Sequence, residues 1–133
     1  MSELQAAMGL AVLPYMDVIF EERKKVVNYY NAHLNFKKLK TIKIRANTNW
    51  NYSYYPIIFN TEVALLKTIT KLNENNIFPR RYFYPSLNTL NYVNNIRMPI
   101  SDTIAKRVLF LPLYKGLSKM QLNIICTLIK NNI

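Results

Sequence analysis

The sequence predicts an α+β fold, in which a small, mostly antiparallel sheet carries helices on one face. Three observations lead to this prediction. Apolar residues recur at helical spacing in the first quarter of the chain, four later segments resemble strands, and further helical segments separate those strands. At 133 residues the chain suits a single compact domain, and with 50% apolar residues it can build a core.

The N-terminal region predicts two consecutive helices. Ser2 begins an S-x-x-Q capping box ahead of an alanine-rich stretch. Pro14 interrupts that helix and can occupy the first turn of the next one. Beyond it, apolar residues keep helical spacing as far as Leu34, while charged residues at 21–25 take the outer side. We expect one long amphipathic helix over residues 14–35.

The rest of the chain predicts short strands alternating with helices. Pro56 suggests that its strand lies at a sheet edge or contains a bulge. A proline-punctuated loop is expected at 85–99. The strands are expected at 41–45, 52–59, 77–84 and 108–113, with helices at 61–73, at 101–106 and after a second capping box at Ser118. In the helix at 61–73, the residues expected to face inward are Leu65, Leu66, Ile69 and Leu72.

The net charge of +11, from eighteen basic and seven acidic residues, raises the question of nucleic acid. The basic residues form short groups with apolar segments between them, and no nucleic-acid reading motif is recognisable. We therefore expect no nucleic-acid partner. A solvated basic face, or a site for a nucleotide pyrophosphate, fits the pattern better.

The single cysteine and the hydropathy pattern predict a soluble cytoplasmic protein. Cys126 has no intramolecular disulfide partner and lies among apolar residues, so we expect a buried thiol in a reducing compartment. No apolar run approaches the roughly twenty residues of a membrane span. The N-terminus also lacks the pattern of a signal peptide. We expect no membrane partner.

The sequence contains no motif that would by itself indicate a complete active site. Gly9 and Gly116 cannot form a glycine-rich phosphate loop. One histidine, one cysteine and seven dispersed acids do not supply a metal site, and His33 falls on the polar side of the long helix. We therefore expect no catalytic residue and no metal ligand in this chain.

Residues 80–88 form the most site-like segment. Two arginines and two tyrosines lie at the end of a predicted strand, beside a loop. Arginine binds phosphate oxygens bidentately, and tyrosine hydroxyls add hydrogen bonds. The alternative interpretation is structural: residues of a strand alternate between solvent and the core, and these side chains do no more than that.

Three blocks of sequence resemble one enzyme family. SELQAAMGLAVLPYMDVIFEERKKVVNYYNAHL closely resembles the segment that opens the small domain in DegT/DnrJ/StrS-type sugar aminotransferases. RRYFYPSLN is similar to a later block, and IAKRVLFLPLYKGLS resembles the closing strand and the turn into the last helix. The blocks come in the family's order and span nearly the whole chain. The resemblance implies the small C-terminal domain of a fold-type I aminotransferase.

The resemblance also implies a cofactor and partners for the complete enzyme. Family members use pyridoxal phosphate (PLP) as an electron sink to move an amino group, usually from glutamate, onto a keto carbon of a nucleotide-linked deoxysugar. They are homodimers with active sites at the subunit interface. The lysine that binds PLP belongs to a large domain that would precede Met1. We therefore expect this chain alone to bind no PLP and to lack its large-domain partner.

By position, the resemblance assigns Arg81, Tyr84 and Asn88 to the region that lines the sugar-nucleotide pocket. Many members carry histidine where this chain has Asn88. Asparagine still forms hydrogen bonds but cannot become cationic beside a pyrophosphate. Our leading hypothesis is a C-terminal fragment, inactive alone, of a sugar aminotransferase for surface polysaccharide or glycan biosynthesis. The alternative is a stand-alone, non-catalytic module that binds a sugar nucleotide or a protein partner.

Overall fold

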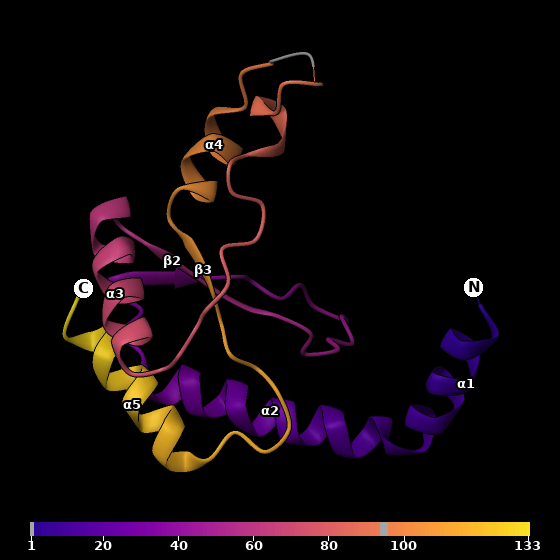
Figure 1. Cartoon of the computed structure of the whole chain (residues 1–133). Coiled ribbons are helices and arrows are strands. Elements are labelled where there is room, and N and C mark those ends of the chain that lie inside the picture. Colours follow the sequence, from indigo (N-terminus) through magenta and orange to yellow (C-terminus); the bar gives the residue numbers. More distant parts are fainter. Residues whose placement is uncertain (1, 94–95) are drawn as a thin grey trace.

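The predicted α+β fold is confirmed by a computed structural model, which describes residues 2–93 and 96–133 (Figure 1). The helices contain far more residues than the three strands, which are short. The elements in order are α1 (Glu3–Val12), η1 (Leu13–Tyr15), α2 (Met16–His33), β1 (Leu39–Thr41), β2 (Tyr55–Phe59), α3 (Glu62–Glu74), η2 (Leu87–Thr89), α4 (Pro99–Ala105), β3 (Val108–Leu111) and α5 (Lys119–Lys130), where η denotes a 3₁₀ turn.

The strands form one antiparallel sheet in the order β1-β2-β3. β2 is central: Ile57 pairs with Thr41 of β1 and with Leu109 of β3. Because side chains alternate along a strand, β2 sends Tyr55, Ile57 and Phe59 to one face, and all three are buried there. Helices α2, α3 and α5 cover that face, as predicted (Figure 1).

The long helix ends where the sequence predicts, and it supplies a wall of the core. Val26, Val27 and Tyr30 of α2 pack with residues of α3, α5 and the sheet in one continuous cluster. Tyr30 is fully buried, and its hydroxyl donates to the carbonyl of Pro112 at 2.9 Å. Burial raises the pKa of Tyr30 far above its ordinary range, so the phenol stays neutral.

Pro56 lies in the central strand and the register with both neighbours is uninterrupted, so the predicted edge position or bulge is wrong. Phe110 exchanges both backbone hydrogen bonds with Arg80, at 2.9 and 3.2 Å, so its bonding groups point away from β2. Pro56, opposite Phe110, therefore directs its own nitrogen and carbonyl toward β1. β1 has already ended at the Thr41–Ile57 pair, and the Thr41 hydroxyl donates to the Pro56 carbonyl at 2.7 Å. The missing N–H thus costs no ladder bond.

Two predicted strands differ from the structure. The strand expected at 41–45 is β1, at Leu39–Thr41, because the chain beyond Thr41 has no strand to pair with. Ile42 and Ile44 are exposed there. The segment 77–84 forms only an isolated bridge at Arg80, next to Pro79, which lacks a donor. In α3, Leu65 and Leu72 are buried and Ile69 packs against the core. Leu66 was wrongly assigned to the core, since the helix turns it to solvent.

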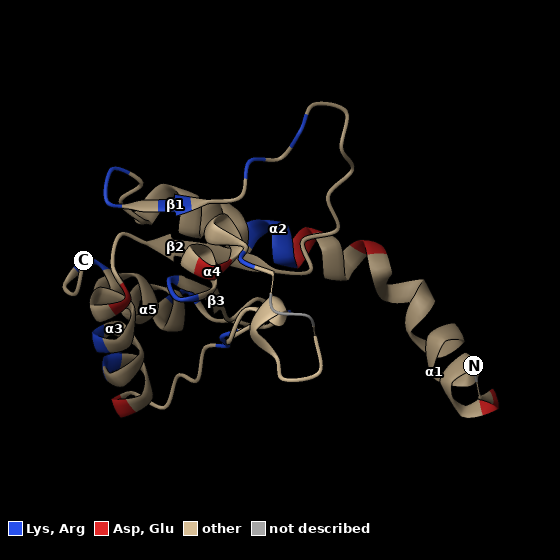
Figure 2. Ribbon diagram, turned by 90° about the horizontal axis from the view of Figure 1, so that it is seen from above, with Lys and Arg blue, Asp and Glu red and all other residues tan. Residues whose placement is uncertain are grey.

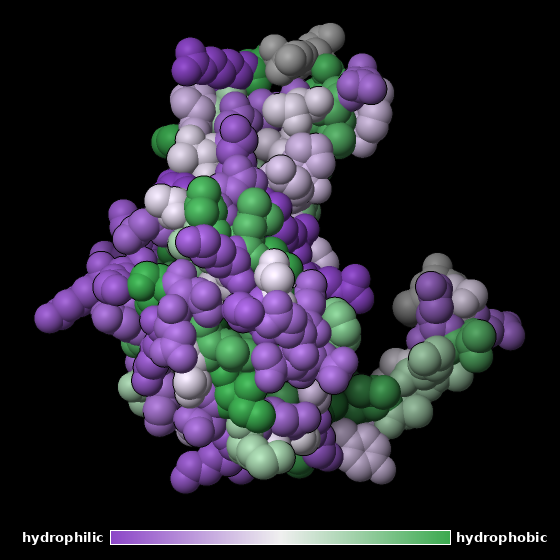
Figure 3. Space-filling view, turned by 60° about the vertical axis from the view of Figure 1, so that its left-hand side comes forward, coloured by the Kyte–Doolittle hydropathy of each residue, from purple (hydrophilic) through white to green (hydrophobic). Residues whose placement is uncertain are grey.

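Helix α1 projects away from the body of the molecule (Figures 1 and 3). Its capping box at Ser2 is present, but none of its residues is buried. Leu4 and Met8 are 71% and 62% exposed, whereas Val108 in β3 is 8% exposed. The projecting surface is apolar, as the green residues of this arm show in Figure 3.

The N-terminal helices also alter the expectation about membrane spans. Over Glu3–His33 the helical stretch contains a window that is long and apolar enough, by length and composition, to cross a membrane, and none of that window is buried. This corrects the expectation that no segment approaches a span. One such helix is weak evidence, because a mostly buried core helix of a soluble protein and a signal sequence near the N-terminus pass the same test.

The two capping boxes give a matched pair of variants. Ser118 accepts from the Gln121 N–H at 3.2 Å at the start of α5, whose apolar face lies in the core. We expect Ser118→Ala to lower the free energy of unfolding by about 1 kcal/mol. Ser2→Ala removes the same bond from α1, which packs on nothing in the described chain, and should leave that free energy unchanged. Denaturant unfolding measures the free energy of unfolding of both variants. Equal losses would contradict the packing of α5 in the core and the exposure of α1.

Candidate functional site

The segment 80–88 leaves the sheet beside β3 and leads to the part of the chain that rises above it with α4 (Figure 1). Its first residue is fixed to β3 by the two backbone bonds between Arg80 and Phe110. The following residues hold the three predicted substrate ligands. The structure keeps these three residues in one loop but gives them different surroundings.

Arg81 is engaged with its own chain. Its Nη2 donates to Glu62 Oε1 at 3.1 Å and to the Lys106 carbonyl at 3.0 Å. Its Cζ lies 3.5 Å from the centroid of the Tyr84 ring, a cation–π geometry. The Arg81 side chain is only 17% exposed. Arg81 therefore ties the loop to α3 and to the end of α4, and it presents Tyr84, which is about half exposed.

Asn88 belongs to a small polar cluster. Its Oδ1 accepts from the Ser86 hydroxyl at 2.6 Å, and its Nδ2 donates to the Ile96 carbonyl at 3.0 Å. The hydroxyls of buried Ser86 and of Ser101 lie 2.9 Å apart. These bonds join the two ends of the loop to α4, so the amide of Asn88 is already hydrogen-bonded on both sides.

An apolar hollow of about 640 Å³ lies on the second face of the sheet, and Asn88 is one of its few polar lining residues. Pro56 and Ile58 of β2 form its floor with Val108, and the loop and α4 enclose it with Phe83 and Ile104. Arg81 and Tyr84 are not among its lining residues. The hollow can hold an apolar or weakly polar group, but its lining has no titratable pair for acid–base chemistry.

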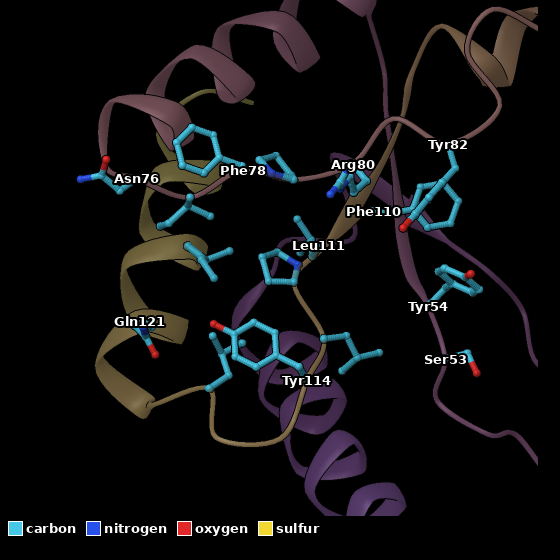
Figure 4. A pocket seen from close by; sticks show the side chains of 16 residues that line it. Ser53, Tyr54, Asn76, Phe78, Arg80, Tyr82, Phe110, Leu111, Tyr114 and Gln121 are labelled. Atoms are coloured by element: carbon cyan, nitrogen blue, oxygen red, sulfur yellow. The ribbon is translucent and has the colours of Figure 1, made fainter. Parts of the chain in front are cut away.

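A second hollow was not predicted from the sequence, and we call it the aromatic notch. It encloses about 400 Å³ between the 76–82 segment, the end of β3 and α5 (Figure 4). Tyr82 and Phe110 line both hollows and so separate them. The pairing of Arg80 with β3 creates the notch, and a local sequence pattern does not show that contact. The residues that define it are Tyr54, Arg80, Tyr82, Phe110, Tyr114 and Gln121.

Charged groups are distributed without a catalytic cluster in the described chain. Lys and Arg occur on α2, β1, α3 and several loops, and α1 carries only Glu3 (Figure 2). No group of three metal-ligating side chains occurs among the described residues. All the lysines are solvent-exposed.

The comparisons with known proteins identify the family. The model of the DegT/DnrJ/EryC1/StrS aminotransferase family matches residues 1–130. The chain belongs to this family. The recognition made from the three sequence blocks is therefore confirmed, and so is the fold implied by it.

Similar proteins are sugar transaminases. The dTDP-4-amino-4,6-dideoxy-D-glucose transaminase of Escherichia coli is 32% identical over 128 residues, covering 90% of this chain and 34% of that protein. The GDP-perosamine synthase of Vibrio cholerae is 29% identical, covering 98% of this chain and 37% of its own length. The aminotransferase TlmJ from Streptoalloteichus hindustanus shares the fold at a TM-score of 0.85 and 17% identity, covering 96% of this chain and 35% of that one. The chain thus spans about a third of the length of these family members.

The Arg81 contacts predict a structural effect of mutation. Arg81→Ala leaves the Glu62 carboxylate unpaired and frees the loop from α3, so we expect the free energy of unfolding to fall by about 1–3 kcal/mol. Lys71 pairs with Glu74 on the exposed side of α3, where both side chains are about half exposed. Lys71→Ala should cost under about 0.5 kcal/mol. Denaturant titration compares them, and equal effects would show that Arg81 does not anchor the loop.

Cys126 is predicted to be inert in the folded protein. Its side chain is 1% exposed, and burial raises the pKa of the thiol from 9.0 to about 11. At pH 8 the folded chain therefore holds almost no thiolate, whereas the unfolded chain holds a substantial fraction. We expect labelling by an aromatic disulfide reagent to be slow until denaturant unfolds the chain. Because the folded pKa is the higher one, stability should also fall as pH rises from about 9 toward 11. Fast labelling of the folded protein would contradict the burial.

Proposed function

We propose that this chain is the C-terminal third of a PLP-dependent aminotransferase that acts on nucleotide-linked keto-deoxysugars, and that it is inactive by itself. The observation that carries the proposal is the family match over residues 1–130 in a chain that spans about a third of its relatives' length. The printed activities of those relatives support a nucleotide-linked sugar as substrate. The product of the complete enzyme would supply surface polysaccharide or glycan assembly.

The remaining two thirds of the enzyme would supply the cofactor site. PLP, when bound, provides the electron sink for amino-group transfer. As the family resemblance implies, a large domain would carry the lysine that holds it. The present chain would add the wall of the substrate pocket, within a homodimer in the cytoplasm. We expect no PLP on this chain alone.

Substrate contacts on this chain would come from Arg81, Tyr84 and Asn88. Tyr84 is about half exposed, and its hydroxyl can act as donor and acceptor. Arg81, held against its ring, would exchange its contact with Glu62 for one with a phosphate oxygen. Asn88 lies at the apolar hollow and would exchange its contact with Ile96 for one with substrate. This is the arrangement expected for a pocket wall that recognises substrate without performing chemistry.

The exposed helix α1 supports the proposal that a further domain covers it. Leu4, Met8 and Leu10 are each more than half exposed on a helix that is apolar nearly all round. Apolar helices of that kind are normally covered on most sides, and an open apolar surface marks an interaction site. We propose that the large domain covers α1 in the complete enzyme, which would also keep this apolar segment in a soluble protein.

One observation favours a second candidate, the stand-alone binding module. The core formed by α2, α3, α5 and the sheet is closed within the described chain, so the body has what it needs to fold without a large domain. Such a module would bind a sugar nucleotide or a protein partner and perform no chemistry.

An activity measurement separates the two candidates. We expect the purified chain, with PLP, glutamate and the 4-keto sugar nucleotide that corresponds to the E. coli relative's product, to form no amino sugar. A hybrid protein, in which this chain replaces the matched third of the E. coli relative, should transfer the amino group from glutamate to the sugar. Intact E. coli enzyme is the positive control, and the same hybrid with Tyr84→Ala and Asn88→Ala should have a raised KM.

Turnover by the chain alone would overturn the proposed inactivity. A correctly folded, PLP-loaded hybrid that forms no amino sugar would favour the stand-alone module, whose signature is saturable binding of the sugar nucleotide by the unfused chain.

A further inference from the structure

A further hollow, which we call the α2 cavity, lies between the first half of α2 and the end of the loop that leads into β2 (Figure 1). It encloses about 620 Å³ and shares no lining residue with the apolar hollow or the aromatic notch. Its helical side follows from the sequence, because residues at i, i+3, i+4 and i+7 share one side of a helix. The residues that line the cavity are Asp17, Phe20, Glu21 and Lys24 on α2 and Asn49, Trp50, Asn51 and Tyr52 on the loop.

Two aromatic rings form the loop side of the α2 cavity. The ring centroids of Trp50 and Tyr52 are 4.7 Å apart, and both residues are partly buried against the core. Asn51, which lies between them in the chain, accepts the Ser53 N–H on its Oδ1 at 3.1 Å and so closes the turn that carries the rings. Packing against the core and this turn hold both rings in place, so the aromatic side of the cavity is preorganised.

The helical side of the α2 cavity brings together two of the seven acidic residues of a chain whose net charge is +11. Asp17 and Glu21 are one helical turn apart. Lys24 Nζ lies 3.3 Å from Glu21 Oε1, and the two side chains are 46% and 64% exposed. None of the ion pairs formed within residues 2–93 and 96–133 includes Asp17. The cavity therefore carries a net negative charge, although the protein as a whole is basic.

This combination of groups suits an organic cation better than a metal ion or an anion. Aromatic ring faces attract cations, and tryptophan does so most strongly. Carboxylates add Coulomb attraction to the same charge and repel an anion. A metal ion requires more ligands, and the described part of the chain has no group of three metal-ligating side chains.

We propose that the α2 cavity binds a small quaternary ammonium ion, with its methyl groups against Trp50 and Tyr52 and its charge near Asp17 and Glu21. A quaternary ammonium group donates no hydrogen bond, so attraction by rings and carboxylates is sufficient to hold it. The volume of the cavity falls within the roughly 300–1,000 Å³ of small-molecule sites. The proposal goes beyond the aminotransferase function and does not depend on it, because the ligand is a cation whereas a nucleotide-linked sugar is an anion.

Trp50 is the only tryptophan of the chain, so its fluorescence reports directly on the α2 cavity. We expect choline chloride to change this fluorescence saturably, and sodium chloride at the same ionic strength to cause no saturable change. The neutral alcohol 3,3-dimethylbutan-1-ol has the shape of choline without its charge and should bind about tenfold more weakly. A nucleotide-linked sugar should not compete with choline, which separates this site from that of the stand-alone binding module.

Variants on α2 test the role of charge. Asp17→Asn and Glu21→Gln should each weaken choline binding several-fold, because each removes one of the two carboxylates. Lys24→Gln should strengthen the binding several-fold, because it removes a cation that pairs with Glu21 in the same cavity. Loss of folding cannot produce such a gain in affinity.

Glu74→Gln is the matched control for Glu21→Gln. Glu74 also pairs with a lysine three positions away on a helix, but it lies on α3 and outside the cavity. Its replacement should change the affinity for choline by less than about twofold. Equal losses in the two variants would overturn the proposal, since attraction by overall charge would then explain the binding.

Four further results would each overturn the proposal: absence of saturation, equal binding of the neutral alcohol, unchanged or weaker binding by Lys24→Gln, and competition by a nucleotide-linked sugar. Failure of the hybrid enzyme leaves the choline titration unaffected, and the reverse also holds, because this binding is measured without turnover.

Discussion

The central strand β2 fixes both the core and the site, because its side chains alternate between two different environments. Tyr55, Ile57 and Phe59 are buried against α2, α3 and α5 and exclude water from that face. Pro56 and Ile58 point the other way and form the floor of the apolar hollow beneath the loop and α4. A shift of one residue in register would exchange the two sets. It would put Pro56 in the core and Tyr55, Ile57 and Phe59 beneath the hollow, so the pairing that stabilises the domain also shapes that hollow.

Neighbouring arginines acquire opposite roles from the same alternation. The backbone of Arg80 pairs with Phe110 as in a strand, so successive side chains leave on opposite sides. Arg80 enters the aromatic notch, whereas Arg81 reaches Glu62 and Lys106 and stacks on Tyr84. The charge of Arg81 is therefore paired with Glu62 and holds the loop, whereas the charge of Arg80 stays available to a ligand. Composition alone treats the two as one basic pair.

The sequence predicts the helices better than the strands, and the reason is physical. Helical spacing and capping boxes are local, so the helix after Pro14 and the start of α5 at Ser118 agree with the structure. A strand exists only where a partner lies alongside: residues 42–45 alternate correctly but meet none, and 77–84 keeps a single bridge at Arg80. The same limit applies to the site. The 80–88 loop was found from its residue types, whereas the notch joins segments far apart in the chain and has no local signal.

The body and the arm of this chain draw their stability from different sources. Ile125, Ile129 and Leu72 are covered by residues of the same chain, so the body closes its own core. Helix α1 has ten residues, a capping box and no buried side chain. Isolated helices shorter than about 12–15 residues are marginal in water, even with good caps. Continuity with α2 through the turn at Pro14 orients α1 but buries none of it. Apolar contact from outside these residues would stabilise α1, and Leu4, Met8 and Leu10 are the side chains that it would cover.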